Sequence, residues 1–376
     1  MQIRQLEAFT FPVPFKRVFK HASASRRNAE NLIVAAHSAE GTTGYGEGCP
    51  RLYVTGETVH GCAAFVRRHA ESFCADVGSV DDLWAWADAH RGIIDLNPAA
   101  FCAMEIAALD LLGKAHGRNL EQLLGVASGP PDVAYSAVLG DMPLPLYRWQ
   151  LRGYWARGFT DYKVKLSGSL RRDRAKLAPF ASRGSGSTSV RLDANNLWES
   201  PEQCAEHLDA LGDVAFAIEE PLQAGDIEGC VRIARDCEVR IIADESLRTS
   251  QQLQTLTEPQ RWIANVRVSK MGGVLRSLEV VAAVARAGID VIVGCQVGET
   301  SLLTRAALAV IASAPGAVIA AEGAFGTHLL SRDLTDPTIM FGYGGVLRGR
   351  DVPDRSNGGL GLRLGPENLL EPAAGP

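Results

Sequence analysis

Five charged side chains stand at a regular interval along the middle of the chain, and each follows a short run of apolar residues. They are Lys165, Asp193, Glu219, Asp244 and Lys270. Apolar runs bounded by polar or glycine residues are typical of buried parallel strands. The interval of about 25–30 residues is the length of one strand, one helix and two short loops in a barrel. The pattern predicts that these side chains surround one barrel mouth, where such folds place their chemistry.

The three carboxylates predict a site for a divalent cation. Asp193, Glu219 and Asp244 follow three successive strands, so they would converge and repel one another unless a cation lay among them. Hard oxygen ligands that leave positions open for substrate favour Mg²⁺, with Mn²⁺ as an alternative. Any one of these acids could instead cap a helix. The regular interval and the flanking lysines favour the metal site over that structural interpretation.

The lysines on either side of this site predict acid–base chemistry. Lys163 and Lys165 are two residues apart on a strand, so both point to the same side. Two ammonium groups so close lower each other's pKa, which leaves one of them nearer neutrality. Lys270, which we place on the sixth strand, would stand on the other side of the mouth. Such lysines could exchange a proton at the carbon next to a substrate carboxylate, with the cation stabilising the enediolate.

The elements that must position these residues form a barrel of eight strands. The interval continues to Gln296 and Glu322, which predicts a seventh and an eighth strand, and the segment from Val133 to Val138 supplies the first. We therefore predict an α/β fold, a (β/α)7β TIM-like barrel over residues 126–345, carrying the active site.

A smaller domain precedes the barrel. Residues 1–47 alternate in strand fashion and are broken by glycine and charged turns, which predicts a three-stranded antiparallel meander. Helical patterns follow over 56–73, 80–90 and 98–116, the last beginning at Pro98 and ending before Gly117. We predict an N-terminal α+β capping domain over 1–125, completed by a C-terminal segment, 346–376, that returns to it.

Composition excludes several classes of function. The chain has 376 residues, 46% hydrophobic and 22% charged, with a formal net charge of −5, so a nucleic-acid partner is not expected. No apolar run reaches the about 18 residues of a membrane span, and the N-terminus lacks the apolar stretch of a signal peptide, so we expect no membrane partner and a cytoplasmic location. The eight cysteines contain no CxxC pair, which favours buried reduced thiols over a metal or disulfide framework.

The order of these motifs resembles the enolase superfamily. Lys163-Val164-Lys165, Asp193-Ala194-Asn195, Glu219-Glu220-Pro221, Ala243-Asp244-Glu245-Ser246 and Ser269-Lys270-Met271-Gly272-Gly273 are similar, in this order, to its muconate-lactonising subgroup, which includes muconate cycloisomerase and mandelate racemase-like proteins. The resemblance extends over nearly the whole chain. Sites with a lysine or histidine base and Mg²⁺ are an established pattern of that superfamily.

The resemblance implies a role for each matching residue. Asp193, Glu219 and Asp244 would be the Mg²⁺ ligands, with Glu219 preferred to Glu220 because it takes the first acidic position before the proline. Lys165 would be the acid–base lysine, Lys163 the partner that lowers its pKa, and Lys270 the opposed lysine.

The same comparison implies residues that bind the substrate. Asn195 would lie near metal and substrate, and Glu299 would be the acid after the seventh strand; Glu322 follows the eighth strand. In the capping loops, at roughly 15–25 and 50–55, the candidates are His21, Arg51 and Tyr53. The expected partner is a small carboxylate substrate, and proteins of this family usually assemble as homo-oligomers.

The residues leave more than one reaction open. Dipeptide epimerases of the subgroup carry Asp-x-Asp after the eighth strand, whereas this chain has Glu322-Gly323-Ala324, which disfavours a dipeptide and favours a muconate-type cycloisomerase slightly. A racemase or epimerase of an amino-acid derivative, and a syn-dehydratase of a small hydroxy acid or a hydroxyproline-like compound, remain alternatives. A metal-dependent hydrolase would need histidine ligands that the strand ends lack, and a non-catalytic binding protein would not need both lysines and all three carboxylates.

Overall fold

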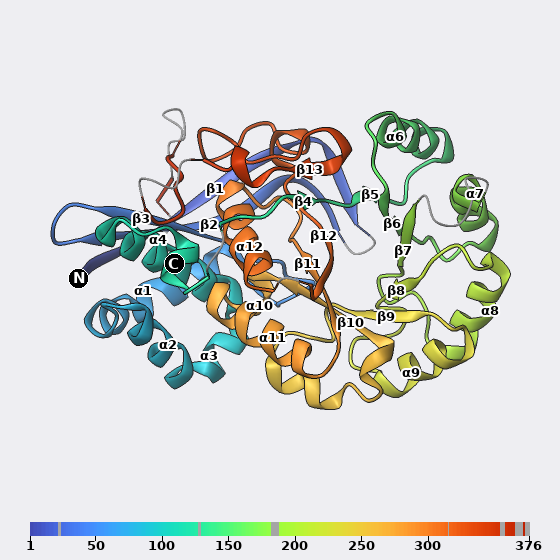
Figure 1. Ribbon diagram of the computed structural model, residues 1–376, viewed down its shortest axis with the longest axis horizontal. Helices are drawn as coiled ribbons and strands as arrows, with labels where there is room; N and C mark the ends of the chain where they lie inside the picture. Colours follow the sequence, from blue (N-terminus) through green and yellow to red (C-terminus); the bar gives the residue numbers. More distant parts are fainter. Residues whose placement is uncertain are drawn as a thin grey trace.

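The chain folds into a capping domain and a barrel that lie side by side (Figure 1). The computed structural model describes residues 1–21, 24–126, 129–181, 188–314, 316–353, 358–364 and 371–372, with the side chains of 17–26 and 371–372 left out. Among these residues, no helix is long and apolar enough to cross a membrane. The predicted fold class is confirmed: a parallel sheet with outer helices, preceded by an α+β cap.

Eight parallel strands form the barrel sheet in chain order, from β5 to β12. Their bounds are β5 Ala137–Leu139, β6 Asp161–Lys165, β7 Ser189–Asp193, β8 Ala217–Glu219, β9 Arg240–Ala243, β10 Trp262–Arg267, β11 Asp290–Gly294 and β12 Val318–Ala321. The sheet curls so that its two edge strands, β5 and β12, come together. At this seam the Ser136 backbone N–H and hydroxyl both donate to Ala321 O at 2.9 Å. All strands therefore end at one mouth.

One expected strand is divided in two. The segment from Val133 to Val138 was predicted to be the first barrel strand, but β4, Val133–Ala134, pairs antiparallel with β13, Val346–Leu347, outside the barrel. Only β5 pairs with β6. The division follows from the contact of Ser136 with Ala321, which turns the chain into the barrel at that point.

Helices cover the outside of the barrel (Figure 1). They are α6 Leu144–Ala156, α7 Leu170–Ala181, α8 Pro201–Leu211, α9 Ile227–Asp236, α10 Val268–Met271, α11 Val274–Arg286 and α12 Ser301–Ser313. The connection between β9 and β10 holds two 3₁₀ helices, η1 Ser250–Thr255 and η2 Pro259–Arg261, in place of an α-helix. Short 3₁₀ segments also occur later in the chain, η3 Gly326–His328, η4 Tyr343–Gly345 and η5 Gly349–Asp351.

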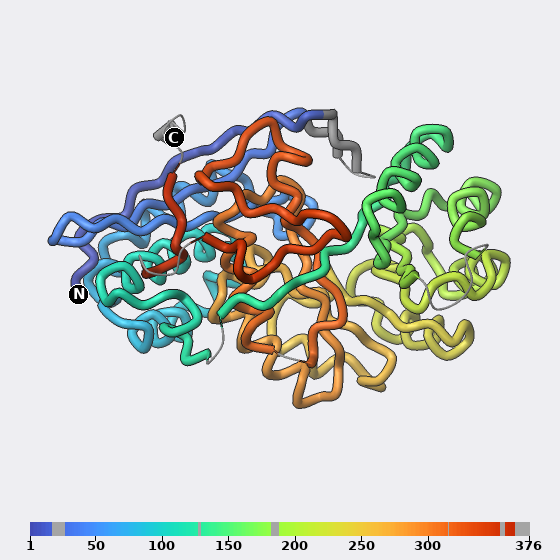
Figure 2. Tube along the Cα trace, turned by 45° about the horizontal axis from the view of Figure 1, so that its top comes forward, coloured from blue at the N-terminus to red at the C-terminus, as the bar shows by residue number. Residues whose placement is uncertain are grey.

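The cap has a four-stranded antiparallel sheet in the order β14-β1-β2-β3. Its elements are β1 Ile3–His21, β2 Ala24–Ser38, β3 Thr43–Gly48, α1 Val59–Asp76, α2 Val80–Ala89, α3 Arg91–Leu96, α4 Pro98–His116 and α5 Leu120–Leu123. The fourth strand, β14, Glu371–Pro372, is C-terminal and pairs with Phe9 and Thr10 of β1. These two C-terminal residues thus lie along the first strand of the chain (Figure 2).

A stripe of glycines lets helix α4 lie directly on strand β3. A Cβ atom on Gly46 would come within 2.2 Å of Ala103 O, and Gly44 and Gly48 meet the same helix as closely. These glycines alternate along β3, so they share one face of the strand. The alternation Gly44-Tyr45-Gly46-Glu47-Gly48 is therefore the sequence signal for this close approach.

Two buried glutamates of the cap bind the first turns of barrel helices. Glu47, on β3, accepts hydrogen bonds from Thr300 N at 3.0 Å and from Leu303 N at 3.2 Å at the start of α12. Glu105, on α4, accepts from Val274 N and Leu275 N at 2.6 and 2.8 Å at the start of α11. Both carboxylates satisfy backbone N–H groups that a helix leaves without an internal partner. They connect the cap to the barrel near its mouth.

Candidate active site at the barrel mouth

The three predicted carboxylates lie on neighbouring strands at the mouth. Asp193 and Glu219 are the last residues of β7 and β8 and are paired in register, and Asp244 follows directly after β9. All three are buried. The strand-end positions inferred from the regular interval are therefore where the structure places these acids.

Lys163 is bound by several of these acids. Its Nζ lies 2.7 Å from Glu219 Oε2 and 3.3 Å from both Asp193 Oδ2 and Glu322 Oε2. Burial acts to lower the pKa of Lys163, but the surrounding carboxylates outweigh it and raise the pKa above its ordinary value. Lys163 therefore keeps its positive charge at the mouth.

Lys165, the last residue of β6, is the most exposed of the three lysines Lys163, Lys165 and Lys270. Its side chain is 16% exposed, and its Nζ lies 3.2 Å from Asp193 Oδ2, the oxygen that Lys163 also faces. The ammonium donates to Asn195 Oδ1 at 2.7 Å. Burial acts to raise the pKa of Asp193, but Lys165 and Lys163 together lower it. The two lysines thus share one side of the strand, as their spacing predicts.

A left-handed turn places Asn195 beside Lys165. Asn195 and Asn196 have φ angles of 48° and 60°, which asparagine adopts more readily than most residues. The Asn196 amide binds Leu222 O and fixes the turn. The pair Asn195-Asn196 is thus a local signal that the chain bends back toward the mouth after β7.

Lys270 does not lie on the sixth strand, so that expectation is wrong. Strand β10 ends at Arg267, and Lys270 belongs to the short helix α10 that follows. Its side chain is 0% exposed and donates to Asp244 O and Asp244 Oδ1 at 2.7 Å each and to Asn265 O at 2.8 Å. Burial, together with Arg267, lowers the pKa of Lys270 to about 7. These hydrogen bonds hold Lys270 between Asp244, which follows β9, and Asn265, which lies within β10.

The sequence analysis missed Arg267, which occupies the strand-end position instead. Its guanidinium donates to Asp244 Oδ2, to Glu219 Oε1 at 3.4 Å and to Gln296 Oε1 at 3.1 Å. A signal was present in the sequence: Arg267 follows the apolar run of β10 directly, whereas Lys270 comes three residues later.

The structure separates the roles of the two adjacent glutamates, Glu219 and Glu220. Glu220 accepts from Asp244 N at 2.6 Å and from Ser246 N and Ser246 Oγ at 2.8 Å each, so its carboxylate holds the turn after β9. Glu219 points to the mouth, beside Lys163. The preference for Glu219 as a metal ligand stays a prediction. Because Glu220 is occupied by the turn after β9, Glu219 is the one of the two acids that could bind a metal ion.

Acceptor oxygens that have no hydrogen-bond donor indicate where a cation could bind. Among the described residues, Asp193 Oδ1 has no hydrogen-bond partner, and Glu219 Oε2 has the Lys163 ammonium beside it as an ion pair only. The described side chains contain no group of three acidic, histidine or cysteine residues already arranged around a metal position, because Lys163, Arg267 and Lys270 lie against the three acids. Hard acceptors without partners are nevertheless the donor set that Mg²⁺ takes.

Two further substrate-binding candidates, Glu322 and Glu299, have different surroundings. Glu322 is bound by Arg191 Nη2 at 2.9 Å and by Lys163, which hold its pKa at about 2 against the effect of burial. Glu299 accepts from the backbone N–H of Gln296, and burial raises the pKa of Glu299 to about 8. Glu322 therefore neutralises buried cations, whereas Glu299 is held near the mouth as a neutral acid at pH 7.

The cap candidates behave differently from one another. Arg51 is 1% exposed and donates to Pro50 O at 2.6 Å and to Val297 O, so it ties the cap to the loop after β11. Tyr53 is partly exposed; burial acts to lower the pKa of Arg267, whereas Glu219, Glu322 and, to a smaller extent, Tyr53 raise it. The side chain of His21 lies outside the described residues. Tyr53 is thus the cap residue that these interactions link to the site.

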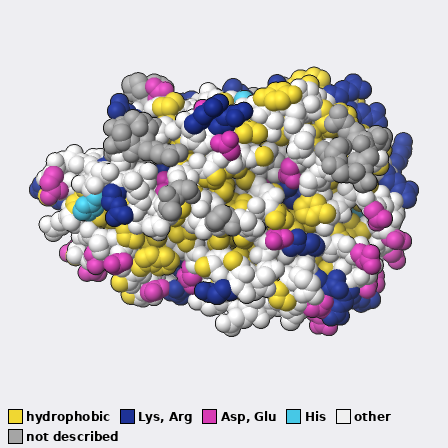
Figure 3. Space-filling view, in the orientation of Figure 1, with side chains coloured by type: hydrophobic (Ala, Val, Ile, Leu, Met, Phe, Trp, Pro, Cys, Tyr) yellow, Lys and Arg dark blue, Asp and Glu magenta, His cyan; other side chains and the backbone are white. Residues whose placement is uncertain are grey.

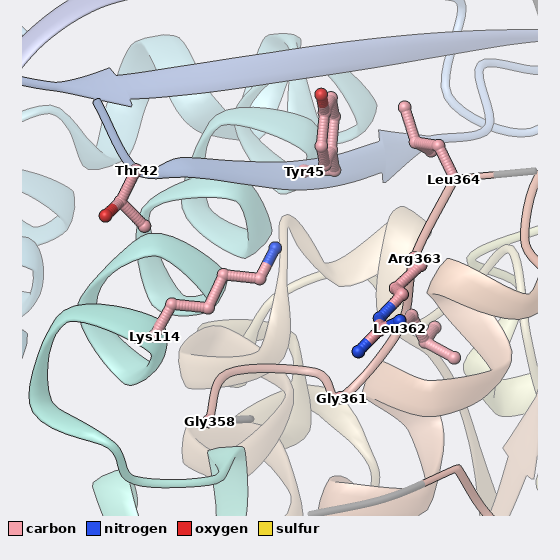
Figure 4. A pocket seen from close by; sticks show the side chains of 8 residues that line it. All are labelled: Thr42, Tyr45, Lys114, Gly358, Gly361, Leu362, Arg363 and Leu364. Atoms are coloured by element: carbon pink, nitrogen blue, oxygen red, sulfur yellow. The ribbon is translucent and has the colours of Figure 1, made fainter. Parts of the chain in front are cut away.

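Two further surface features are a cavity beside the cap and the distribution of charge on one face. A cavity of about 390 Å³ opens between the cap and the C-terminal segment, with Tyr45, Lys114 and Arg363 in its wall (Figure 4). The Lys114 ammonium is already bound by Asp110 at 2.7 Å and by Thr43 O. On the face shown in Figure 3, acidic and basic side chains lie interspersed. Among the described residues, neither feature brings several carboxylates and lysines together as the barrel mouth does, so the mouth is the candidate active site.

Comparison with known families matches both parts of the chain. Residues 5–125 match the mandelate racemase / muconate lactonizing enzyme N-terminal domain, and residues 147–368 match the enolase C-terminal domain-like family. The chain belongs to the enolase superfamily. Within it, the N-terminal match assigns the chain to the mandelate racemase and muconate lactonizing enzyme group, which confirms the resemblance seen in the motifs.

Individual relatives within this group are isomerases. The chain is 31% identical to a hydrophobic dipeptide epimerase of Roseobacter litoralis over 73% of this chain and 77% of that protein. It superposes with a TM-score of 0.85 and 25% identity on a dipeptide epimerase of Cytophaga hutchinsonii solved with Mg and the dipeptide D-Ala-L-Val, covering 99% of both chains. It also shares the fold of a muconate lactonizing enzyme, with a TM-score of 0.82 and 22% identity over 97% of both chains. The chain is an isomerase of the enolase superfamily.

Proposed function

We propose that this protein moves a proton at the carbon next to a substrate carboxylate, in a Mg²⁺-dependent reaction in which Lys165 transfers the proton. The observation that carries the proposal is the placement of Lys165 at the mouth, 3.2 Å from Asp193, within a row of three acids from neighbouring strands. Its partial exposure gives a substrate access to the ammonium.

The residues around Lys165 support this role. Lys163 stays charged and neutralises Glu219 and Glu322, so the mouth can bind an anionic substrate despite its acids. Asn195 accepts one N–H of Lys165 and orients the amine. A general acid or base must be held within hydrogen-bond reach of the carbon-bound proton, and this contact fixes one side of the amine while the other side faces the mouth.

Asp193, Glu219 and Asp244 would hold the cation. Once bound, a divalent cation supplies positive charge that stabilises negative charge developing on the substrate carboxylate. The Cytophaga hutchinsonii epimerase was solved with Mg, which supports the choice of ion. The unpaired Asp193 Oδ1 supports the choice of ligand.

Two reactions of this kind are supported by separate observations. Epimerisation or racemisation of an amino-acid derivative is supported by the relatives, which are named dipeptide epimerases. Cycloisomerisation is supported by Glu322, because Arg191 and Lys163 already bind this acid, so it is not free to bind a substrate amino group after β12. A substrate with a blocked or absent amino group suits both reactions.

The test is proton exchange in D₂O. The Mg²⁺-loaded protein is incubated with N-acyl amino acids, hydroxy acids, proline derivatives and cis,cis-muconate, and NMR follows each compound. The proposal expects deuterium at the α-carbon of at least one compound. Chelation of the metal and the substitution Lys165→Met should each abolish the exchange while the circular dichroism spectrum is unchanged. Exchange that persists in Lys165→Met would show that another residue transfers the proton.

A further inference from the structure

Arg267 and Lys165 stand on opposite sides of the barrel mouth. Each is the last residue of its strand, β10 and β6. In the closed sheet three strands separate β6 from β10 in one direction, and β11, β12 and β5 separate them in the other. A substrate carbon between them would therefore face Lys165 on one side and Arg267 on the other.

Strand alternation directs Arg267 inward. Ile263 lies in the cluster of barrel-interior side chains with Ile242 and Ile292, and Asn265 reaches 3.5 Å from Glu219 Oε1. Residues two apart on a strand share a face, so Arg267 continues this inward row. Its side chain is 12% exposed, which places the guanidinium at the rim.

The mouth presents unpaired donors as well as unpaired acceptors. Among the described residues, Arg267 Nε and Gln296 Nε2 are buried and have no hydrogen-bond partner. Gln296 is itself 1% exposed and binds Arg267 through its Oε1 atom. A buried donor without a partner is costly unless a ligand supplies an acceptor. Arg267 is the last residue of β10 and Gln296 lies two residues after the end of β11, so both stand at the strand ends that form the mouth.

Lys270 cannot take the place of Arg267 on this side. An ammonium group has three N–H donors, and Lys270 donates to two oxygens of Asp244 and to Asn265 O. Lys270 thus links Asp244, which follows β9, to Asn265 of β10. Releasing it would leave the buried Asp244 carboxylate and two carbonyl groups without this donor.

We propose that Arg267, with Gln296 beside it, is the substrate-binding residue opposite Lys165, that Lys270 is a positioning residue only, and that the proton is exchanged at one face of the substrate. This inference rests on the proposed function and specifies its site. Arg267 Nε–H and Gln296 Nε2–H donate to an oxygen of the substrate's carboxylate. A guanidinium keeps its protons in proteins, so it holds charge opposite Lys165 but takes no proton from carbon.

Proton exchange at one face selects between the two candidate reactions. When the C–H bond breaks, the proton goes to the neutral amine form of Lys165, which becomes the ammonium, and the electron pair moves into the carboxylate group; in the reverse direction the Lys165 ammonium returns the proton to the same face. Inversion would require a donor on the face held by Arg267. The site therefore favours ring-forming or ring-opening isomerisation over epimerisation.

Calorimetry with malonate tests the assignment without a known substrate. Malonate is titrated into Mg²⁺-loaded wild type, Arg267→Met, Arg267→Lys and Lys270→Met, each against the same Mg²⁺ buffer. We expect Arg267→Met to lose at least about tenfold in affinity, since charged hydrogen bonds are removed, and Arg267→Lys to lose less. At Mg²⁺ concentrations that saturate each variant, Lys270→Met should bind malonate within about threefold of wild type but unfold at a lower temperature. If Lys270→Met does not fold, Lys270→Arg, which keeps the positive charge, is measured in its place.

The outcomes separate this inference from the proposed function. Wild-type affinity in Arg267→Met, or a tenfold loss in a folded Lys270 variant, would overturn the assignment while leaving the metal and Lys165 in place. A wild type that binds no Mg²⁺ would overturn the proposed function as well. In D₂O, N-acyl amino acids that exchange their α-proton should keep their configuration, and accumulation of both enantiomers would refute exchange at one face.

Discussion

Replacing Glu105 with alanine should weaken the attachment of the cap to the barrel. The Glu105 carboxylate is buried on α4 and accepts from Val274 N and Leu275 N, the first amides of α11. It also lies against Gly273, where an added Cβ would be 2.3 Å from Glu105 Oε2. The side chain and the helix terminus therefore fit each other closely.

The cost follows from the groups left unpaired. Two buried N–H donors lose their acceptor, and each costs about 1–3 kcal/mol when no water replaces it. The loss of a helix cap costs about 1 kcal/mol by itself, but this is part of the same effect. We therefore expect Glu105→Ala to lower the free energy of unfolding by about 2–4 kcal/mol. Glu105→Gln keeps one acceptor oxygen and should lose about half as much.

Urea denaturation followed by circular dichroism measures this change. The matched control is Glu228→Ala, because Glu228 also lies in the first turn of a helix, α9, but is exposed. The control should change the free energy of unfolding by less than about 0.5 kcal/mol. If Glu105→Ala unfolded at the same urea concentration as the control, the buried carboxylate would not be holding the helix, and the reasoning would be wrong.

Three further predictions concern the site and the cap. Glu220→Ala removes the hydrogen bonds that hold the turn carrying Asp244, so Mg²⁺ affinity measured by calorimetry should fall about 10–100-fold; an unchanged affinity would contradict this role. Because burial raises the pKa of Glu299 from 4.5 to about 8, the folded protein binds this proton more tightly than the unfolded chain, and the resulting stability, complete below about pH 4.5, is lost as the pH rises through 8. Thermal midpoints between pH 6 and 9 should therefore fall less in Glu299→Gln than in wild type, and equal slopes would refute the shift. Gly46→Ala should cost about 1–3 kcal/mol in urea denaturation, because its Cβ would lie 2.2 Å from Ala103 O, and a neutral effect would show that α4 can move away.

The sequence by itself determined the barrel and most of its mouth. The interval between charged residues and the apolar runs before them define one strand per unit, because a parallel barrel buries its strands and leaves their C-terminal ends polar. Strand alternation also placed Lys163 and Lys165 on one side. These inferences depend on periods of two residues and of one βα unit, which are properties of the chain itself.

Only the tertiary structure decided which side chains stand at the mouth and which are buried. Whether β10 ends at Arg267 or continues to Lys270 depends on where the backbone turns, and it turns into α10 before the left-handed Gly272 and Gly273. Lys270 is fully buried against Asp244 and Asn265, whereas Arg267 is 12% exposed at the end of its strand. Arg51 was likewise assigned to the substrate because it lies in a capping loop, whereas its guanidinium is buried against Val297 O. Spacing along the chain gives the strand on which a residue lies, but burial and hydrogen-bond partners depend on contacts between residues far apart in sequence, which no local pattern contains.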